Sequence, residues 1–183
     1  KTALTGIRYE WQSFNNCGPA NLAMALSFWG WQGDQRDTRA FLRPNEDDAN
    51  VMPEEMLAYV QANTALKAEM RVAGDLATVK RLVAAGFPVI LEIGHHPPKD
   101  WWMGHYVVVS GYDDAYAALI TQDSLIMADL PLPYAELQTR WWRDFNHLYL
   151  VLYPPERQAE VYAILGPDAD PLANWQRALA LAE

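Results

Sequence analysis

The segment QSFNNCGPANLAMALSFWG, residues 12–30, decides how the rest of the sequence is interpreted. Its first part is polar and turn-forming, and at Cys17 it changes to a run dense in helix formers. Pro19 is tolerated only in a first helical turn, and Gly30 is of a type that commonly follows a helix end. The sequence therefore predicts a helix over 17–29 that begins at the cysteine.

Cys17 is the only cysteine of the chain, and its position suits a nucleophile. A thiol reacts as its thiolate, and the unpaired N–H groups at a helix N-terminus favour that form. The neighbours Asn15, Asn16 and Gly18 place the thiol at a loop-to-helix junction rather than within an apolar face. A lone cysteine is also commonly an inert small hydrophobe. Position alone therefore leaves both interpretations open.

Helical patterns continue through the first part of the chain. Helices are expected over 35–42 and 53–60, where the second begins at a proline. An alternating pattern over 67–74 predicts a strand, and Asp75 is the expected cap of a helix over 76–86.

The second part changes to short runs rich in β-branched and aromatic residues, separated by turn signals. The expected strands are 87–94, 104–112, 117–121 and 147–153, with a helix over 134–145 before the last. A helical front followed by an antiparallel sheet is an α+β arrangement. A site formed from both parts would lie between the two layers.

A helical pattern returns at the C-terminal end, in the runs 156–165 and 174–183. The predicted organisation is one domain over 1–154 with a helical tail over 155–183. The last run resembles the first helix of a tetratricopeptide-like repeat, so the tail is a candidate contact for a protein partner.

The composition limits the classes of function. With 183 residues, of which 51% are hydrophobic, the chain suits a compact globule. Its net charge of -9, with acids spread along the chain, offers no basic stripe for phosphate groups. Nucleic acid and anionic membrane are therefore not expected partners. No apolar run reaches the roughly 18 to 20 residues that span a bilayer, so this segment is not expected to insert into a membrane.

Three further residues are candidates for a site with Cys17. His105 opens the run GHYVVVSGY, where a rigid strand suits a general base. Asp123 ends the next apolar run, where strand pairing would bring its carboxylate to the imidazole. Gln12, five positions before the cysteine, carries an uncharged donor that would bracket an oxyanion together with the cysteine N–H. The ordinary alternatives are a half-buried histidine, a turn aspartate and an exposed loop glutamine.

The adjacent His95 and His96 do not predict a metal site. No cysteine or carboxylate occurs beside them at a recognisable ligand spacing, and adjacent side chains in a strand point to opposite faces. They are expected to belong to a loop. We expect neither a metal nor a cofactor.

The segments QSFNNCGPANLAMALSFWG, MGHYVVVSGYDD and TQDS resemble the three signature segments of one enzyme family, in the same order. The family is that of the papain-like cysteine peptidases of the bacteriocin-leader, double-glycine-processing type, including their stand-alone relatives. The resemblance spans about Trp11 to Tyr153. It implies a papain-like fold in which an N-terminal helical layer carrying the cysteine packs on an antiparallel sheet carrying the histidine and the aspartate.

Carried across residue by residue, the resemblance implies that Cys17 is the nucleophile, His105 the base, Asp123 the residue that orients it and Gln12 the oxyanion donor. Many family members have an aspartate before the cysteine and a glutamine six positions ahead of it. This chain departs from that pattern, with Asn16 and a five-residue interval.

The favoured function is that of a cysteine-type peptidase that cleaves a peptide or protein through a thioester acyl-enzyme. The same chemistry suits a thiol acyltransferase or amidase, and a non-catalytic peptide-binding module is a third interpretation. The chain begins at Lys1 rather than at methionine, which predicts an upstream segment. Stand-alone family members are often exported, which favours an extracellular or cell-envelope location over a cytoplasmic one.

Overall fold

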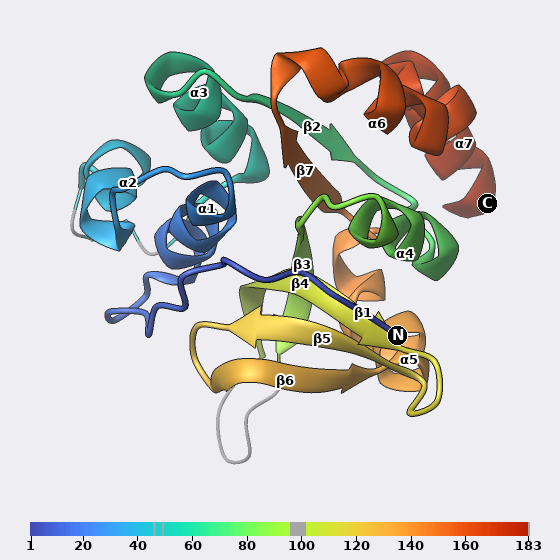
Figure 1. Ribbon diagram of the computed structural model, residues 1–183, viewed down its shortest axis with the longest axis horizontal. Helices are drawn as coiled ribbons and strands as arrows, with labels where there is room; N and C mark the ends of the chain where they lie inside the picture. The colour runs from blue at the N-terminus through green and yellow to red at the C-terminus, as the bar shows by residue number, and fades with distance from the viewer. Residues whose placement is uncertain (46, 49, 96–101, 183) are drawn as a thin grey trace.

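The computed structural model describes residues 1–45, 47–48, 50–95 and 102–182. Within these residues seven strands form one antiparallel sheet in the order β2-β7-β3-β4-β5-β6, with β1 beside β4 (Figure 1). The strands are β1 (Thr2–Ala3), β2 (Lys67–Arg71), β3 (Val89–His95), β4 (Met103–Asp113), β5 (Ala118–Asp123), β6 (Met127–Pro133) and β7 (Tyr149–Tyr153).

The longer helices form two groups on different sides of this sheet (Figure 1). They are α1 (Cys17–Phe28), α2 (Gln35–Leu42), α3 (Pro53–Asn63), α4 (Leu76–Ala84), α6 (Gln158–Leu165) and α7 (Pro171–Ala182). The first three make up one group, and the last three the other. Among the residues described, none of the helices combines the length and apolarity needed to cross a bilayer.

Alternate side chains of the central strands are buried on the two faces of the sheet. On β4, Tyr106 and Val108 belong to the apolar cluster that includes α1 and α3. Val107 and Val109 belong to the cluster that includes α4 and α6. Strands that are buried on both faces have continuous apolar runs rather than alternating ones. This double burial explains the run of valines in the sequence of β4.

Two of the strands are not expected from the sequence. β1 is only two residues long, and β6 contains Pro131 and Pro133. Proline cannot donate to a sheet ladder and is therefore confined to edges, and β6 is the strand at one edge of this sheet. The prolines that fit β6 to the edge also remove the strand pattern from its sequence.

The helix expected over 134–145 is not continuous, and that prediction was wrong. The segment forms a short α5 (Tyr134–Glu136), a π-helical turn η1 (Leu137–Trp141) and a 3-10 turn η2 (Arg143–Phe145). Leu137 and Trp142 are both buried, and the Trp142 N–H donates to the Leu137 carbonyl at 3.1 Å. A π turn places residues five apart on the same face, which an α-helix does not. Burial of both side chains thus favours the π turn.

The C-terminal helices pack against the preceding part of the chain. Val161 and Leu165 of α6 belong to the same buried cluster as the apolar residues of α4. Arg71, at the end of β2, donates to the carbonyl oxygens of Asp168 and Ala169 in the connection to α7. The segment expected to be a tail therefore contributes side chains to the main core.

Candidate active site

Cys17 is the first residue of α1, at the position that the sequence predicts. The helix is buried from Gly18 to Leu26, whereas the Cys17 side chain is partly exposed. A Cβ on Gly18 would lie 2.8 Å from the Cβ of Val51, so the absence of a side chain lets the segment before α3 pack against the helix start. The thiol therefore lies at the accessible end of an otherwise buried helix.

His105 and Asp123 lie on the neighbouring antiparallel strands β4 and β5. The Nε2 atom of His105 is 2.9 Å from Oδ1 of Asp123, and the two residues are only 1% and 3% exposed. The backbone N–H groups of Leu125 and Ile126 donate to the same Oδ1, at 2.8 Å and 3.1 Å. The turn after β5 thus fixes the carboxylate that faces the ring.

The His105 ring also forms a hydrogen bond with the Cys17 side chain. Because Nε2 faces Asp123, Nδ1 is the ring nitrogen that remains for the sulfur. Cys17, His105 and Asp123 are therefore brought together in one hydrogen-bonded series. Its members come from α1, β4 and β5, and so from both the helical layer and the sheet.

The environment favours the charged forms of His105 and Asp123. Burial lowers the pKa of His105, but the hydrogen bonds to Asp123 and Cys17 raise it by more, to about 9. Burial raises the pKa of Asp123, but the hydrogen bond and charge of His105 hold it below its ordinary value. An imidazolium beside a carboxylate is the result expected at neutral pH.

Gln12 lies beside the residue that follows Asp123. Its backbone N–H donates to the Ser124 carbonyl at 2.9 Å, and the Ser124 hydroxyl donates to its side-chain Oε1 at 2.8 Å. Tyr9, three residues earlier, donates its hydroxyl to the Asp123 carbonyl at 2.8 Å. The segment before the cysteine is thus tied to the turn that holds the aspartate.

The first turn of α2 and the residue just after that helix hold the loop between Gln12 and Cys17. The Gln35 side chain accepts from the Ser13 N–H at 2.8 Å and from the Asn16 side-chain amide at 2.7 Å. The Arg43 guanidinium, which is buried, donates to the carbonyl of Asn15. Asn15 has a φ of 50°, a left-handed conformation that asparagine tolerates better than most residues. The loop geometry is therefore supported by residues outside the loop.

The sequence does not predict Asn21 and Ser124 as members of the site. Both are fully buried, and the Asn21 amide donates to the Ser124 hydroxyl at 3.0 Å and to the Cys17 carbonyl at 2.9 Å. One signal is available: Asn21 is a polar residue within the apolar run of α1. Buried polar groups need partners, so such a residue indicates a hydrogen-bond network. The identity of the partners is not visible in the sequence.

His95 is the last residue of β3 rather than part of a loop. The residues 96–101, including His96, lie outside the described residues. Trp102, which follows them, stacks on Phe145 with ring centroids 5.7 Å apart. Its ring N–H donates to Asp144 at 2.8 Å, which directs this tryptophan toward η2.

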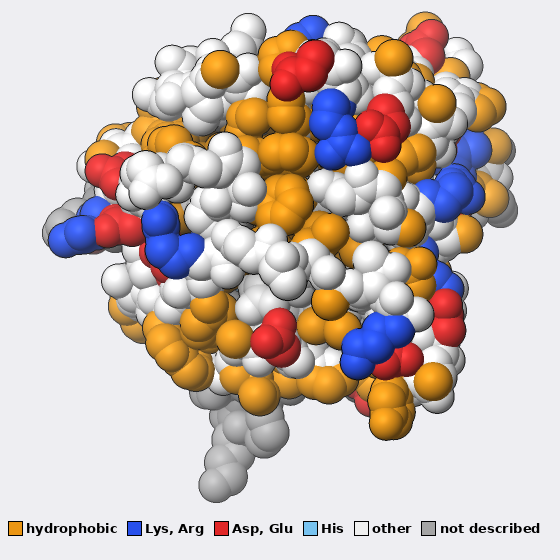
Figure 2. Space-filling model, in the orientation of Figure 1, with side chains coloured by type: hydrophobic (Ala, Val, Ile, Leu, Met, Phe, Trp, Pro, Cys, Tyr) orange, Lys and Arg blue, Asp and Glu red, His pale blue; other side chains and the backbone are white. Residues whose placement is uncertain are grey.

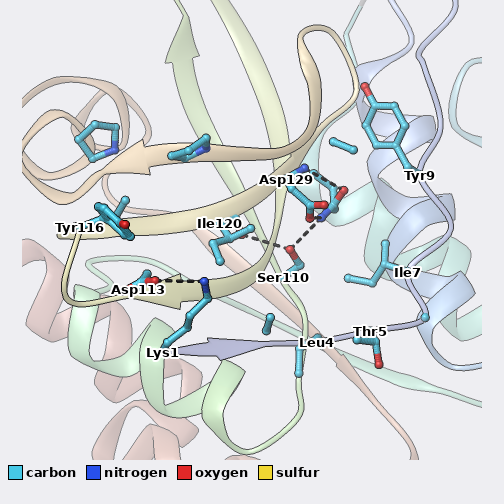
Figure 3. Close-up of a pocket in the computed structure, with 17 residues that line it drawn as sticks. Lys1, Leu4, Thr5, Ile7, Tyr9, Ser110, Asp113, Tyr116, Ile120 and Asp129 are labelled. Carbon is cyan, nitrogen blue, oxygen red and sulfur yellow. Dashed lines mark hydrogen bonds and ion pairs between the residues drawn. The ribbon is translucent and has the colours of Figure 1, made fainter.

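A separate cavity of about 890 Å³ lies between residues 1–9 and the strands β4, β5 and β6 (Figure 3). Gln122 lines it, whereas Asp123 points to His105. Successive side chains of a strand point to opposite faces, so the cavity and the hydrogen-bonded series lie on opposite faces of β5. On the face shown in Figure 2, basic and acidic side chains are interspersed among apolar ones.

Comparison with known proteins finds a matching family and several similar solved structures. The family described as "Peptidase C39 like family" matches residues 4–146. This range includes all four residues that the sequence predicts for the site. No curated protein matches the chain at a significant level.

Three solved structures resemble the fold. A protein from Bacillus anthracis described as a C39-like peptidase has a TM-score of 0.70 and 17% identity, covering 84% of this chain and 97% of its own. The peptidase domain of Streptococcus ComA, a bifunctional transporter in a quorum-sensing pathway, has a TM-score of 0.63 and 18% identity, covering 80% and 96%. A double-glycine-motif protease from an AMS/PCAT transporter, solved with its leader peptide, has a TM-score of 0.60 and 18% identity, covering 84% and 95%.

Proposed function

Because the chain belongs to the Peptidase C39 like family, we propose that it is a cysteine peptidase whose nucleophile is Cys17. In this proposal His105 moves the protons, Asp123 orients the ring of His105, and Gln12 donates to the oxyanion. A peptide or protein is the proposed substrate. One of the structures with a similar fold was solved with a leader peptide bound, which supports a peptide as ligand.

The observation that carries the proposal is the contact of one imidazole with both a thiol and a buried carboxylate. The His105 ring is hydrogen-bonded to Cys17, and its Nε2 lies 2.9 Å from Asp123. A raised histidine pKa favours transfer of the thiol proton to the ring, which leaves a thiolate beside an imidazolium. This ion pair is the reactive form of a cysteine nucleophile.

In the acylation step, the Cys17 thiolate attacks the carbonyl carbon of the scissile bond, and the carbonyl oxygen becomes an oxyanion. The N–H groups at the start of α1 precede the first helical hydrogen bond, which runs from Ala20 to Asn16 at 3.0 Å. The Cys17 N–H is therefore available to the oxyanion, with the Gln12 amide as second donor. The His105 imidazolium then protonates the leaving amine as the C–N bond breaks, and a thioester remains.

In the deacylation step, His105 is neutral and accepts a proton from a water molecule that attacks the thioester carbonyl. The C–S bond breaks, the carboxylic acid product leaves, and the thiolate and imidazolium are restored. Asp123 stays ionised throughout and stabilises the charged ring.

The test compares wild type with Cys17→Ser on a peptide library, with mass spectrometry of the new termini. We expect cleavage by wild type alone. If both proteins produce the same new termini in equal amounts, the proposed function is overturned. A thiol-directed electrophile gives a second measurement, since it should label wild type and leave Cys17→Ala unlabelled.

The same assay separates hydrolysis from acyl transfer. Products formed in the presence of a primary amine should carry a free carboxyl group if water is the acceptor. If the products carry the amine in preference to a free carboxyl group, the proposed function becomes that of an acyltransferase that uses the same thioester.

A further inference from the structure

A glutamine can donate to an oxyanion only if its carboxamide has one particular orientation. The NH₂ group must face the reacting carbonyl, and the oxygen must face away from it, because an acceptor oxygen would repel the developing charge. Gln12 is only partly buried, so packing alone does not fix that choice. What fixes it is its contact with Ser124, whose hydroxyl donates to Oε1 of Gln12 at 2.8 Å.

The direction of the Ser124 hydroxyl is fixed in turn by Asn21. A hydroxyl has one proton to donate, and the Asn21 amide nitrogen lies 3.0 Å from the Ser124 oxygen as a donor to it. An amide nitrogen does not accept a hydrogen bond, so the hydroxyl proton is directed to the other partner, Gln12. Both Asn21 and Ser124 are fully buried, so water does not compete for these bonds.

The orientation of Asn21 is set by two backbone carbonyls. Its amide nitrogen carries two protons, which are shared among three acceptors: the Cys17 carbonyl at 2.9 Å, the Tyr106 carbonyl at 2.7 Å and the Ser124 hydroxyl at 3.0 Å. Carbonyls only accept, so this end of the side chain must be the NH₂ group. The opposite atom, Oδ1, is buried and has no hydrogen-bond partner among the described residues. An unpaired buried oxygen costs stability, and the contacts of the NH₂ group offset that cost.

We propose that Asn21 and Ser124 are positioning residues that orient the Gln12 carboxamide with its NH₂ group toward the oxyanion. The series runs from two carbonyls through Asn21 and Ser124 to Gln12, and each donor fixes the next one. It also joins the two oxyanion donors, because Asn21 is anchored to Cys17 itself. This inference rests on the proposed peptidase function.

The test uses Ser124→Ala, with Ser124→Thr as the matched control that keeps the hydroxyl. Loss of one oxyanion donor costs about 10²- to 10³-fold in kcat, so a misoriented Gln12 should cost about tenfold or more with little change in KM. A peptide aldehyde, which forms an oxyanion with the thiol, should bind more weakly by a similar factor. Alkylation of Cys17 by iodoacetamide forms no oxyanion and should keep its rate. Ser124→Thr should retain most of the activity.

A double-mutant cycle with Gln12→Met identifies the route of the effect. If Ser124 acts through Gln12, Ser124→Ala should cause little further loss in the Gln12→Met background. Equal losses in both backgrounds, or slower alkylation by the same factor, would overturn the inference. Asn21→Leu, which is similar in volume and suits an apolar helix, repeats the cycle if Ser124→Ala does not fold.

The outcomes also separate this inference from the proposed function. A wild type that neither cleaves peptide nor binds the aldehyde would contradict the proposed function itself. An active wild type with independent effects of Ser124 and Gln12 would contradict only the positioning role.

Discussion

The Nε2 atom of His105 lies 2.9 Å from Oδ1 of Asp123, where neither residue is more than 3% exposed. In such a dry environment a charged hydrogen bond is stronger than in water, and an unpaired partner is costly. The same contact raises the pKa of the ring and lowers that of the carboxyl. The two residues therefore titrate as a pair, and the properties of either depend on the other.

The pH dependence of activity should reflect the state of His105. Its raised pKa, about 9, means that the ring stays protonated at neutral pH and loses its proton as the pH rises through that value. We expect kcat/KM for a cleaved peptide to fall on the alkaline side with an apparent pKa near 9. Steady-state kinetics in buffers from about pH 6 to about pH 10.5 would measure this apparent pKa. A profile that stays level to the alkaline end would contradict this assignment.

Asp123→Asn should shift that alkaline limb to lower pH. The substitution removes the charge that raises the His105 pKa, while burial continues to lower it. We expect kcat to fall by roughly 10²-fold, because the ring loses its orienting partner. Alkylation of Cys17 should persist in part. Asp114→Asn, in the exposed turn after β4, is the matched control and should leave the profile unchanged. If the alkaline limb of Asp123→Asn lies at the same pH as that of wild type, the coupling between His105 and Asp123 is contradicted.

Gly18→Ala should destabilise the protein although alanine favours helix. A Cβ at this position would lie 2.8 Å from the Val51 Cβ, which is side-chain overpacking. Overpacking costs about 1–3 kcal/mol, which exceeds the gain of about 1 kcal/mol from helix propensity. Urea unfolding would measure the change. In a Val51→Gly background, which lacks that Cβ, Gly18→Ala should cost less stability than it does in wild type. A single variant more stable than wild type would disprove the clash.

Asn174→Ala should loosen the C-terminal helix from the sheet. The buried Asn174 side chain accepts from the Val72 N–H at 3.1 Å and donates to the Val72 carbonyl at 2.9 Å. Loss of both bonds should cost about 1–3 kcal/mol in the free energy of unfolding. Leu179→Ala, at an exposed position of the same helix, should change it by less than about 0.5 kcal/mol. Equal effects of the two substitutions would show that α7 is not held by Asn174.

Local signals made much of the fold predictable. The helix at Cys17 begins where the polar loop ends, and the valines of β4 indicate a strand buried on both faces. β6 was not predictable, because Pro131 and Pro133 suit an edge that only the assembled sheet defines. The π turn likewise depends on burial of two side chains five residues apart, which no local propensity encodes.

The candidate site was predictable only in part, for a related reason. Two of its predicted residues stand at recognisable junctions, which are the helix start at Cys17 and the strand end at Asp123. The residues that support them are polar groups whose partners are remote. Asn21 and Ser124 are 103 positions apart, and Ser124 and Gln12 are 112 positions apart. Such pairs are defined by the packing of α1 on the sheet and have no sequence period.

The thiol belongs to α1, whereas the imidazole and the carboxylate belong to β4 and β5. Under the proposed mechanism, a newly synthesised chain that has formed only one of these layers lacks either the thiol or the imidazole in its place. Such a chain is not able to cleave neighbouring proteins. Damage that separates α1 from β4 would abolish the proposed activity before the rest of the fold is lost. Under the proposed mechanism, reactivity thus depends on the same packing of α1 against β4 and β5 that completes the fold.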